Sequence, residues 1–396
     1  MDATMKPRNT GDVEKVVAWA AAEDQPLEII GQGSKRTLGR PVQAAHVLDL
    51  SGLTGVESYE PAELVLTVKA GTPIAEVEKL VDDNGQELSF EPMDFGPLLG
   101  VTPAQGTIGG VLAANLSGPR RIKAGAARDH VLGMEAVSGR GEIFNSGGKV
   151  VKNVTGYDLP RALCGAYGTL AVATTVTLKV NPKPETSATF VLSGLDDDDG
   201  IKALCKAMGS SAEVSGAAHL PAGVNGGSSS TVLRLEGFST SVDYRFKTLQ
   251  ALLGTYGTPS RLEASETGAL WQTIRDVKPY AGGETPVWRL SVAPTAGPQL
   301  VANLGEAFEL QAYYDWSGGL VWLSCLDGSL HEAEIRAAID AVGGGHATLV
   351  RADASQRSNV PVFHPQPAPL AALSRRLKEQ FDPKGILNPG KMVSGV

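Results

Sequence analysis

Residues 147–170 read GGKVVKNVTGYDLPRALCGAYGTL, and this glycine-rich stretch leads into a run of β-branched residues that ends at Val180. The stretch closes a longer block, since 15 of the 47 glycines fall between Gly96 and Gly168. These glycines lack the three-residue period of collagen. Because glycine has no Cβ, we interpret the block as backbone that approaches another group closely.

Two further glycine clusters precede this stretch. The first, residues 30–35 (IGQGSK), follows a strand-like run and has the spacing of neither a dinucleotide fingerprint nor a Walker A loop. Its N–H groups form a nest for an anion, or else it is an ordinary turn after a strand. The second, residues 102–118 (TPAQGTIGGVLAANLSG), predicts a tight turn that opens a helix of small residues. A flat ligand or a pyrophosphate can lie on that backbone, although a closely packed helix and turn is the alternative.

Composition excludes several classes of protein. The chain has 396 residues, 42% of them hydrophobic, and a net charge of −8, which is typical of a globular protein and argues against a dedicated nucleic-acid binder. Its cysteines, Cys164, Cys205 and Cys325, are isolated, so we predict no metal site, no iron–sulfur motif and no disulfide framework. Neither a secretory signal nor an apolar membrane span is present in the sequence, and we predict a cytoplasmic location.

The pattern of elements predicts an α+β protein with three parts. Residues 1–182 alternate strand-like and helical runs before the proline-containing break at Asn181–Pro184. Residues 183–362 alternate strands with longer helices, which predicts a cap domain made of an antiparallel sheet with helices on one face. Residues 363–396 contain a proline-rich connector, an amphipathic helix and a turn-rich tail.

Taken together, the three glycine clusters resemble the FAD-binding half of the vanillyl-alcohol-oxidase/p-cresol-methylhydroxylase (VAO/PCMH) flavoproteins. Residues 147–170, residues 118–133 (GPRRIKAGAARDHVLG) and residues 381–392 (FDPKGILNPGKM) are most similar to the E-type FAD-binding subunits of bacterial glycolate oxidase, or glycolate dehydrogenase. The resemblance implies a two-subdomain PCMH-type FAD-binding domain over residues 1–182. It also implies that the tail, residues 363–396, returns from the cap to this domain.

The resemblance implies FAD-binding roles for residues in four segments. The first loop and the second loop would cradle the flavin and its pyrophosphate, one strand would pass the adenosine, and the C-terminal segment would complete the site. Some members attach FAD covalently through a histidine in the first loop, where this chain has none, so we expect non-covalent FAD. The implied residues are Gly31, Gln32, Gly33, Ser34, Lys35, Pro103, Gly106, Thr107, Gly109, Gly110, Ser117, Gly118, Gly168, Thr169, Val172, Asn388 and Lys391.

Catalytic residues are harder to assign. Oxidation of a 2-hydroxy acid needs a carboxylate anchor and a base or metal, but the histidine-rich metal motif of related catalytic dehydrogenases is missing here. Arg289 and Arg351 are candidate anchors, or else structural arginines. Lys152 and Tyr157 either meet the flavin or stabilise their loop. The basic stretch 120–128 faces a partner, the FAD phosphate or solvent.

We therefore expect an FAD-dependent oxidoreductase subunit that works beside a catalytic FAD subunit and an iron–sulfur subunit. In this interpretation its flavin transfers electrons during oxidation of glycolate or a similar 2-hydroxy acid, and any membrane association is made through a partner. One alternative is a stand-alone FAD dehydrogenase of a small 2-hydroxy acid or alcohol, using Arg289 and Lys152. Another is a scaffold subunit whose FAD is structural.

Overall fold

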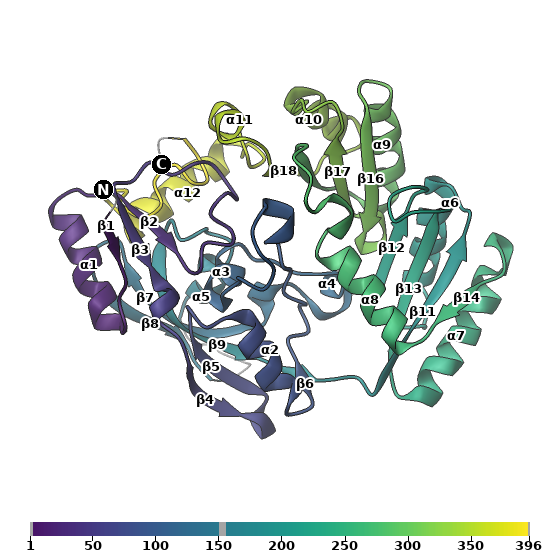
Figure 1. Cartoon of the computed structure of the whole chain (residues 1–396), viewed down its shortest axis with the longest axis horizontal. Coiled ribbons are helices and arrows are strands. Elements are labelled where there is room, and N and C mark those ends of the chain that lie inside the picture. The colour runs from purple at the N-terminus through teal and green to yellow at the C-terminus, as the bar shows by residue number, and fades with distance from the viewer. Residues whose placement is uncertain (1–2, 150–155, 395–396) are drawn as a thin grey trace. The chain divides into compact units, whose positions relative to one another are not determined.

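A computed structural model describes residues 3–149 and 156–394, and the chain divides into two compact units. Unit 1 contains Met1–Ser117, Ala126–Lys183 and Pro365–Val396, and unit 2 contains Gly118–Gly125 and Pro184–His364. Both ends of the chain therefore belong to unit 1 (Figure 1). The short segment 118–125 lies within the predicted first domain in the sequence, but its contacts place it in unit 2.

Unit 1 contains a small parallel sheet and a larger antiparallel one. The parallel sheet has the order β1–β3–β2, and the antiparallel sheet has the order β4–β5–β9–β7–β8. Val13 and Val17 of helix α1 share one apolar cluster with Leu48 of the small sheet and Val137 and Val172 of the large one, so α1 ties the two sheets together. The strands are β1 (Ala3–Met5), β2 (Leu27–Ile30), β3 (His46–Asp49), β4 (Val56–Glu60), β5 (Val65–Lys69), β7 (Val131–Ser138), β8 (Ile143–Gly147) and β9 (Ala171–Lys179).

The remaining elements of unit 1 are a pair of two-residue strands and the helices. A two-stranded antiparallel pair joins β6 (Gln86–Glu87) to β10 (Asn181–Pro182). The C-terminal segment runs beside β2, where Leu387 bridges Leu27, and Figure 1 shows this yellow segment next to the purple strand. The helices are α1 (Thr10–Ala22), α2 (Ile74–Asp82), α3 (Ile108–Ala113), α5 (Leu159–Leu163) and α12 (Ala368–Phe381).

Unit 2 is built on one antiparallel sheet of eight strands in the order β14–β11–β13–β12–β16–β17–β15–β18. The strands are β11 (Thr186–Ser193), β12 (Gly216–Leu220), β13 (Ser230–Gly237), β14 (Ser260–Leu262), β15 (Val287–Ser291), β16 (Leu310–Asp315), β17 (Leu320–Cys325) and β18 (His346–Arg351). The helices are α4 (Arg121–Ala124), α6 (Asp197–Met208), α7 (Ser239–Leu253), α8 (Ala264–Arg275), α9 (Gly297–Gly305), α10 (Glu332–Ala341) and α11 (Ala354–Asn359).

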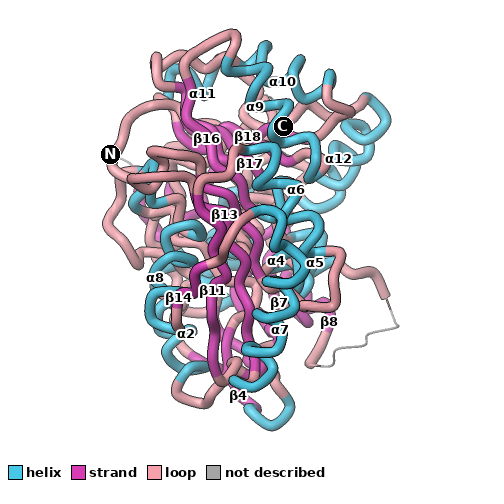
Figure 2. The backbone as a smooth tube through the Cα atoms, turned by 90° about the vertical axis from the view of Figure 1, so that its right-hand side faces the viewer, coloured by secondary structure: helices cyan, strands magenta, loops and turns pink. Residues whose placement is uncertain are grey.

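Helices cover both faces of this sheet, not one face as the sequence predicts. Alternate residues of a strand point to opposite faces, and on β11 Phe190 joins the apolar core formed with α6, α7, α9 and α10. Its neighbour Thr189 points the other way and accepts a hydrogen bond from the indole N–H of Trp271 on α8, at 2.9 Å. Figure 2 shows α7 and α8 on opposite sides of β11. No described helix is long and apolar enough to cross a membrane.

A half-buried ion pair holds segment 118–125 in unit 2. The guanidinium of Arg120 donates to both carboxylate oxygens of Glu236 at 2.9 and 2.5 Å, and Arg234 lies 3.5 Å from the same carboxylate. Burial alone would raise the pKa of Glu236, but Arg234 and Arg120 outweigh it and lower this pKa to about 2. Arg120 therefore makes an internal pair, where the sequence leaves it open to a partner, the FAD phosphate or solvent.

This pair predicts an acid-dependent stability. Because the folded pKa of Glu236 lies below its ordinary 4.5, the pair stabilises unit 2 above pH 4.5 and loses this contribution as the pH falls toward 2. Arg120→Met should lower the free energy of unfolding at pH 7 by about 2 kcal/mol, since Arg234 remains, and should move acid unfolding to higher pH. Urea unfolding at pH 7 measures the free energy, and acid titration measures the midpoint, both followed by tryptophan fluorescence.

The matched control is Lys202→Met on α6, which removes a cation from exposed ion pairs in the same unit. Such pairs contribute about 0–1 kcal/mol, so this variant should unfold nearly as the parent does. Equal losses in the two variants, or an unchanged acid midpoint for Arg120→Met, would contradict the assignment.

Candidate functional site

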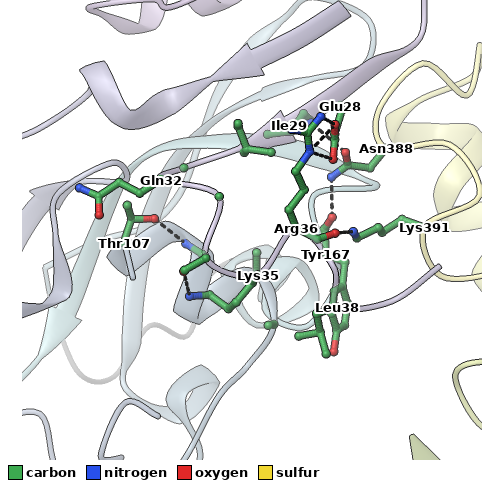
Figure 3. Close-up of a pocket in the computed structure, with 17 residues that line it drawn as sticks. Glu28, Ile29, Gln32, Lys35, Arg36, Leu38, Thr107, Tyr167, Asn388 and Lys391 are labelled. Carbon is green, nitrogen blue, oxygen red and sulfur yellow. Dashed lines mark hydrogen bonds and ion pairs between the residues drawn. The ribbon is translucent and has the colours of Figure 1, made fainter. Parts of the chain in front are cut away.

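Two neighbouring pockets in unit 1 share part of their walls, and we refer to the two together as the hollow. They enclose about 570 and 640 Å³ of empty space, including their open mouths. Their shared wall includes Gly31, Thr107, Gly110, Tyr167 and Asn388, which come from four separate segments of the chain. Figure 3 shows the first pocket, with side chains converging from β2, from the start of α3 and from the C-terminal segment.

The first glycine loop leaves β2 and forms one wall. Gly33 has φ +79°, a left-handed conformation that favours glycine, and the N–H of Arg36 donates to its carbonyl at 3.0 Å. Arg36 in turn holds the carboxylate of Glu28 with both Nε and Nη2, which fixes the base of the loop. Among the described residues, the backbone N–H groups of Gln32, Gly33 and Ser34 have no acceptor. The loop therefore presents unpaired donors, as an anion nest does.

The second loop opens helix α3, and Thr107 is its N-cap. The hydroxyl of Thr107 accepts the N–H of Gly110 at 3.2 Å. The two loops pack closely because Gly31 has no side chain: a Cβ there would lie 2.5 Å from Thr107 Oγ1. A Cβ at Gly109, in α3, would lie 2.8 Å from the carbonyl of Ala70. Both glycines are therefore required by close packing.

Lys35 places an amine between the two loops. Its Nζ lies 3.1 Å from Ser34 Oγ, and a Cβ at Gly106 would lie 3.5 Å from the same atom. A Cβ at Gly110 would lie 3.2 Å from Lys35 Cε. Burial lowers the pKa of Lys35 to about 8, against the opposing charge of Asp94. An anion in the pocket would favour the protonated amine and raise this pKa again.

The third wall combines the start of β9 with the C-terminal segment. The side chain of Asn388 joins them, because its Oδ1 accepts the N–H of Ile29 and its Nδ2 donates to the carbonyl of Tyr167, both at 2.8 Å. A Cβ at Gly168 would lie 2.9 Å from Asn388 Nδ2. Lys391 Nζ donates to the carbonyl of Arg36 at 2.8 Å, so the same segment also holds the first loop (Figure 3).

Twelve of the seventeen residues expected to bind FAD line these pockets, namely Gly31, Gln32, Gly33, Ser34, Lys35, Thr107, Gly109, Gly110, Gly168, Val172, Asn388 and Lys391. The other five lie outside the walls. Pro103 is exposed, the carbonyl of Gly106 accepts the N–H of Ile74, and the hydroxyl of Ser117 accepts the N–H of Ala127. Gly118 accepts the indole N–H of Trp316 in unit 2, and Thr169 Oγ1 donates to Ala166.

None of the described catalytic candidates lines either pocket. In unit 2, the guanidinium of Arg289 lies 4.9 Å from the ring centroid of Trp316. Arg351 donates to the carbonyls of Thr285 and Tyr280 at 2.8 and 2.5 Å, which is a structural use of its fork. Tyr157 is 89% exposed, and Lys152 lies outside the described residues.

Several wall residues were not predicted from the sequence. Glu28, Arg36 and Tyr167 line the first pocket. The opposite charges of Glu28 and Arg36 flank the glycine loop, and that spacing was an available signal for the ion pair that closes it. Tyr167, between Ala166 and Gly168, has φ +54°, and no local pattern of side chains predicts this conformation.

Comparison with known proteins shows the family of the chain. Residues 1–147 match the family described as "FAD binding domain", and residues 366–392 match "FAD linked oxidases, C-terminal domain". The chain is 34% identical over 381 residues to glycolate oxidase subunit GlcE of Escherichia coli, which covers 96% of this chain and 95% of that protein. The chain belongs to the family of this glycolate oxidase subunit. It is an FAD-binding oxidoreductase.

More distant relatives confirm the fold. Glycolate oxidase subunit GlcD of Bacillus subtilis is 32% identical over 191 residues, 48% of this chain and 39% of that protein. Substrate-bound p-cresol methylhydroxylase has a TM-score of 0.70 at 16% identity, over 99% of this chain and 88% of that one. The 4-ethylphenol oxidase of Gulosibacter chungangensis has a TM-score of 0.73 at 14% identity, over 99% of this chain and 89% of that one. The predicted PCMH/VAO-type α+β fold is confirmed.

The residues present in the pockets fit an FAD. Two loops offer glycine backbone without Cβ atoms, and N–H groups of the first loop have no acceptor among the described residues. Three cationic side chains, Lys35, Arg36 and Lys391, lie in the wall of the first pocket. The second pocket adds an apolar wall of Leu50, Ala70, Leu112, Met134 and Leu163, which suits an aromatic ring.

Close packing at Gly109 gives a test of the second loop. Gly109→Ala adds a methyl 2.8 Å from the carbonyl of Ala70, so it should lower the free energy of unfolding by about 1–3 kcal/mol and reduce the FAD content of the purified chain. The control is Gly268→Ala in α8, where a Cβ meets nothing within 4 Å. That variant should gain about 0.5–1 kcal/mol and keep its FAD. Identical behaviour of the two variants would refute the packing argument.

Proposed function

We propose that the chain is the non-covalent FAD-binding redox subunit of a multi-subunit dehydrogenase of glycolate or a similar 2-hydroxy acid. Its flavin carries electrons between a catalytic FAD subunit and an iron–sulfur subunit. The observation that carries this proposal is the first pocket, where unpaired N–H groups and Lys35 face one hollow. No described residue of either pocket wall is a histidine or a cysteine, which supports binding without a covalent bond.

The subunit role rests on the relatives and on the sequence. GlcE and GlcD are both named as subunits of glycolate oxidase. Onward one-electron transfer calls for a redox centre such as an iron–sulfur cluster, and the three isolated cysteines of this chain do not form a cluster motif. Within residues 3–149 and 156–394, no group of three or more histidine, cysteine or acidic side chains is placed to hold a metal ion.

Each wall has a separate task in this proposal. FAD, when bound, supplies the redox chemistry. The N–H groups of Gln32, Gly33 and Ser34 donate to its pyrophosphate, and the amine of Lys35 neutralises part of that charge. Asn388 joins β2 to the loop before β9 and so holds two walls of the pocket together.

Lys35 gives this assignment a pH signature. Since its pKa is about 8 in the empty pocket and rises beside an anion, FAD binding takes up a proton above pH 8, and affinity should fall as the pH rises from 8 to 10. Lys35→Met should bind FAD about 10–100-fold more weakly at pH 7 and lose this dependence. Fluorescence titration of the apoprotein at each pH measures both effects.

Lys15→Met, on the exposed face of α1, is the control for this titration. It should keep the affinity and the pH profile of the parent chain. An unchanged profile in Lys35→Met would place the proton uptake elsewhere and contradict the role of Lys35.

The relay role is tested by anaerobic reduction. The isolated chain should be yellow, should release its FAD on acid precipitation, and should not bleach when glycolate or D-lactate is added. In a complex purified with its flavin and iron–sulfur partners, the same substrate should reduce this flavin. Rapid bleaching of the isolated chain would instead establish a stand-alone dehydrogenase. A flavin that stays oxidised in the working complex would establish a scaffold.

A further inference from the structure

Helix α12 buries a lysine where a helix normally buries an apolar side chain. Of its 14 residues, only Lys378 is buried, whereas Leu370 and Leu373 are 48% and 61% exposed. Lys378 pairs with Asp382, one helical turn later, at 2.7 Å, and the two side chains are 8% and 0% exposed. A buried ion pair often stabilises a fold no better than apolar residues of the same size. A role in placing other groups accounts for it better.

Every hydrogen-bonding group of this pair is used. Lys378 Nζ donates to Asp382 Oδ2 at 2.7 Å, to the carbonyl of Thr169 at 2.7 Å and to the carbonyl of Leu387 at 3.1 Å. Asp382 also accepts the N–H groups of Ile386 and Leu387 at 3.1 and 2.8 Å. Because the ammonium has three donors and all three are occupied, the pair fixes the positions of both backbone segments.

Those two segments each end at the wall of the pocket. Thr169 follows Gly168, and Leu387 precedes Asn388, both of which line the hollow. Asn388 adopts φ +44°, an uncommon conformation for a residue other than glycine, and Asp382 sets the turn that leads to it. Lys378 itself lines neither pocket.

We propose that the buried Lys378–Asp382 pair is a positioning device for FAD, which sets the carboxamide of Asn388 and the Gly168 loop against the cofactor pocket. This inference rests on the proposed function, since it takes the two pockets as the FAD site. The C-terminal segment is then coupled to cofactor binding. By reciprocity, FAD stabilises residues 382–391 by the amount that their placement favours FAD.

Two variants separate positioning from stability. Lys378→Met leaves the Asp382 carboxylate buried without its partner, so it should lower both the stability of the apoprotein and the affinity for FAD. The double variant Lys378→Met/Asp382→Leu replaces the whole pair by apolar side chains, which should restore most of the stability. It still lacks the bonds to Thr169 and Leu387, so its Kd for FAD should remain at least tenfold above that of the parent chain.

Lys79→Met is the matched control, since Lys79 and Asp83 form the same i,i+4 pair on α2 but are 73% and 57% exposed. Lys79→Met should change neither the free energy of unfolding nor the Kd for FAD. The measurements are urea unfolding of the full-length apoprotein and fluorescence titration with FAD. A double variant that regains stability and binds FAD as the parent does would overturn the proposal.

Hydrogen exchange supplies a second readout if the double variant folds poorly. In the parent chain, FAD should slow exchange in residues 382–391, and in Lys378→Met this protection should be reduced. An unchanged exchange rate in the parent segment on FAD binding would overturn the coupling. Failure of the site assignment is distinct, because FAD affinity would then be indifferent to Lys35→Met while the chain still binds FAD.

Discussion

The contact between Gly31 and Thr107 is the constraint on which the site depends. With no side chain at Gly31, the loop after β2 lies against the N-cap of α3, and an added Cβ would reach within 2.5 Å of the threonine hydroxyl. Thr107 cannot move aside without losing its hydrogen bond to Gly110. The two loops are therefore held by packing, and within the described part of the chain the N–H groups of Gln32, Gly33 and Ser34 have no acceptor.

A second constraint is topological. The walls of the hollow come from β2, α3, the start of β9 and the last residues of the chain, while most of unit 2, Pro184–His364, is inserted between Lys183 and Pro365. The chain must therefore return after the whole cap has been made. Leu27 pairs with Leu387, and Asn388 bonds to Ile29, so the return is secured on the same strand that begins the first loop.

The sequence predicts the parts of the site that are local. The glycine loops and the α+β fold follow from spacing and from the family resemblance, because a missing side chain is visible in sequence. Contacts between residues that lie far apart in the sequence cannot be predicted in this way. Arg120 pairs with Glu236, 116 positions later in the sequence, and this contact places segment 118–125 in unit 2. The amphipathic pattern of α12 does not predict that Lys378 is buried while Leu373 is exposed.

Hydrogen-bond accounting distinguishes the two lysines that matter most. The ammonium of Lys378 has three donors, and each of them meets an acceptor in the protein, so it has no donor left for a ligand and can act only through the groups that it holds. The amine of Lys35 makes one hydrogen bond within the described chain, to Ser34 Oγ, and Lys35 lies in the wall of the hollow. Burial lowers the pKa of both amines. Burial therefore has different consequences for the two lysines. The amine of Lys378, with all its donors bonded, fixes the backbone around it, whereas the amine of Lys35 keeps donors with which it can bind an anion.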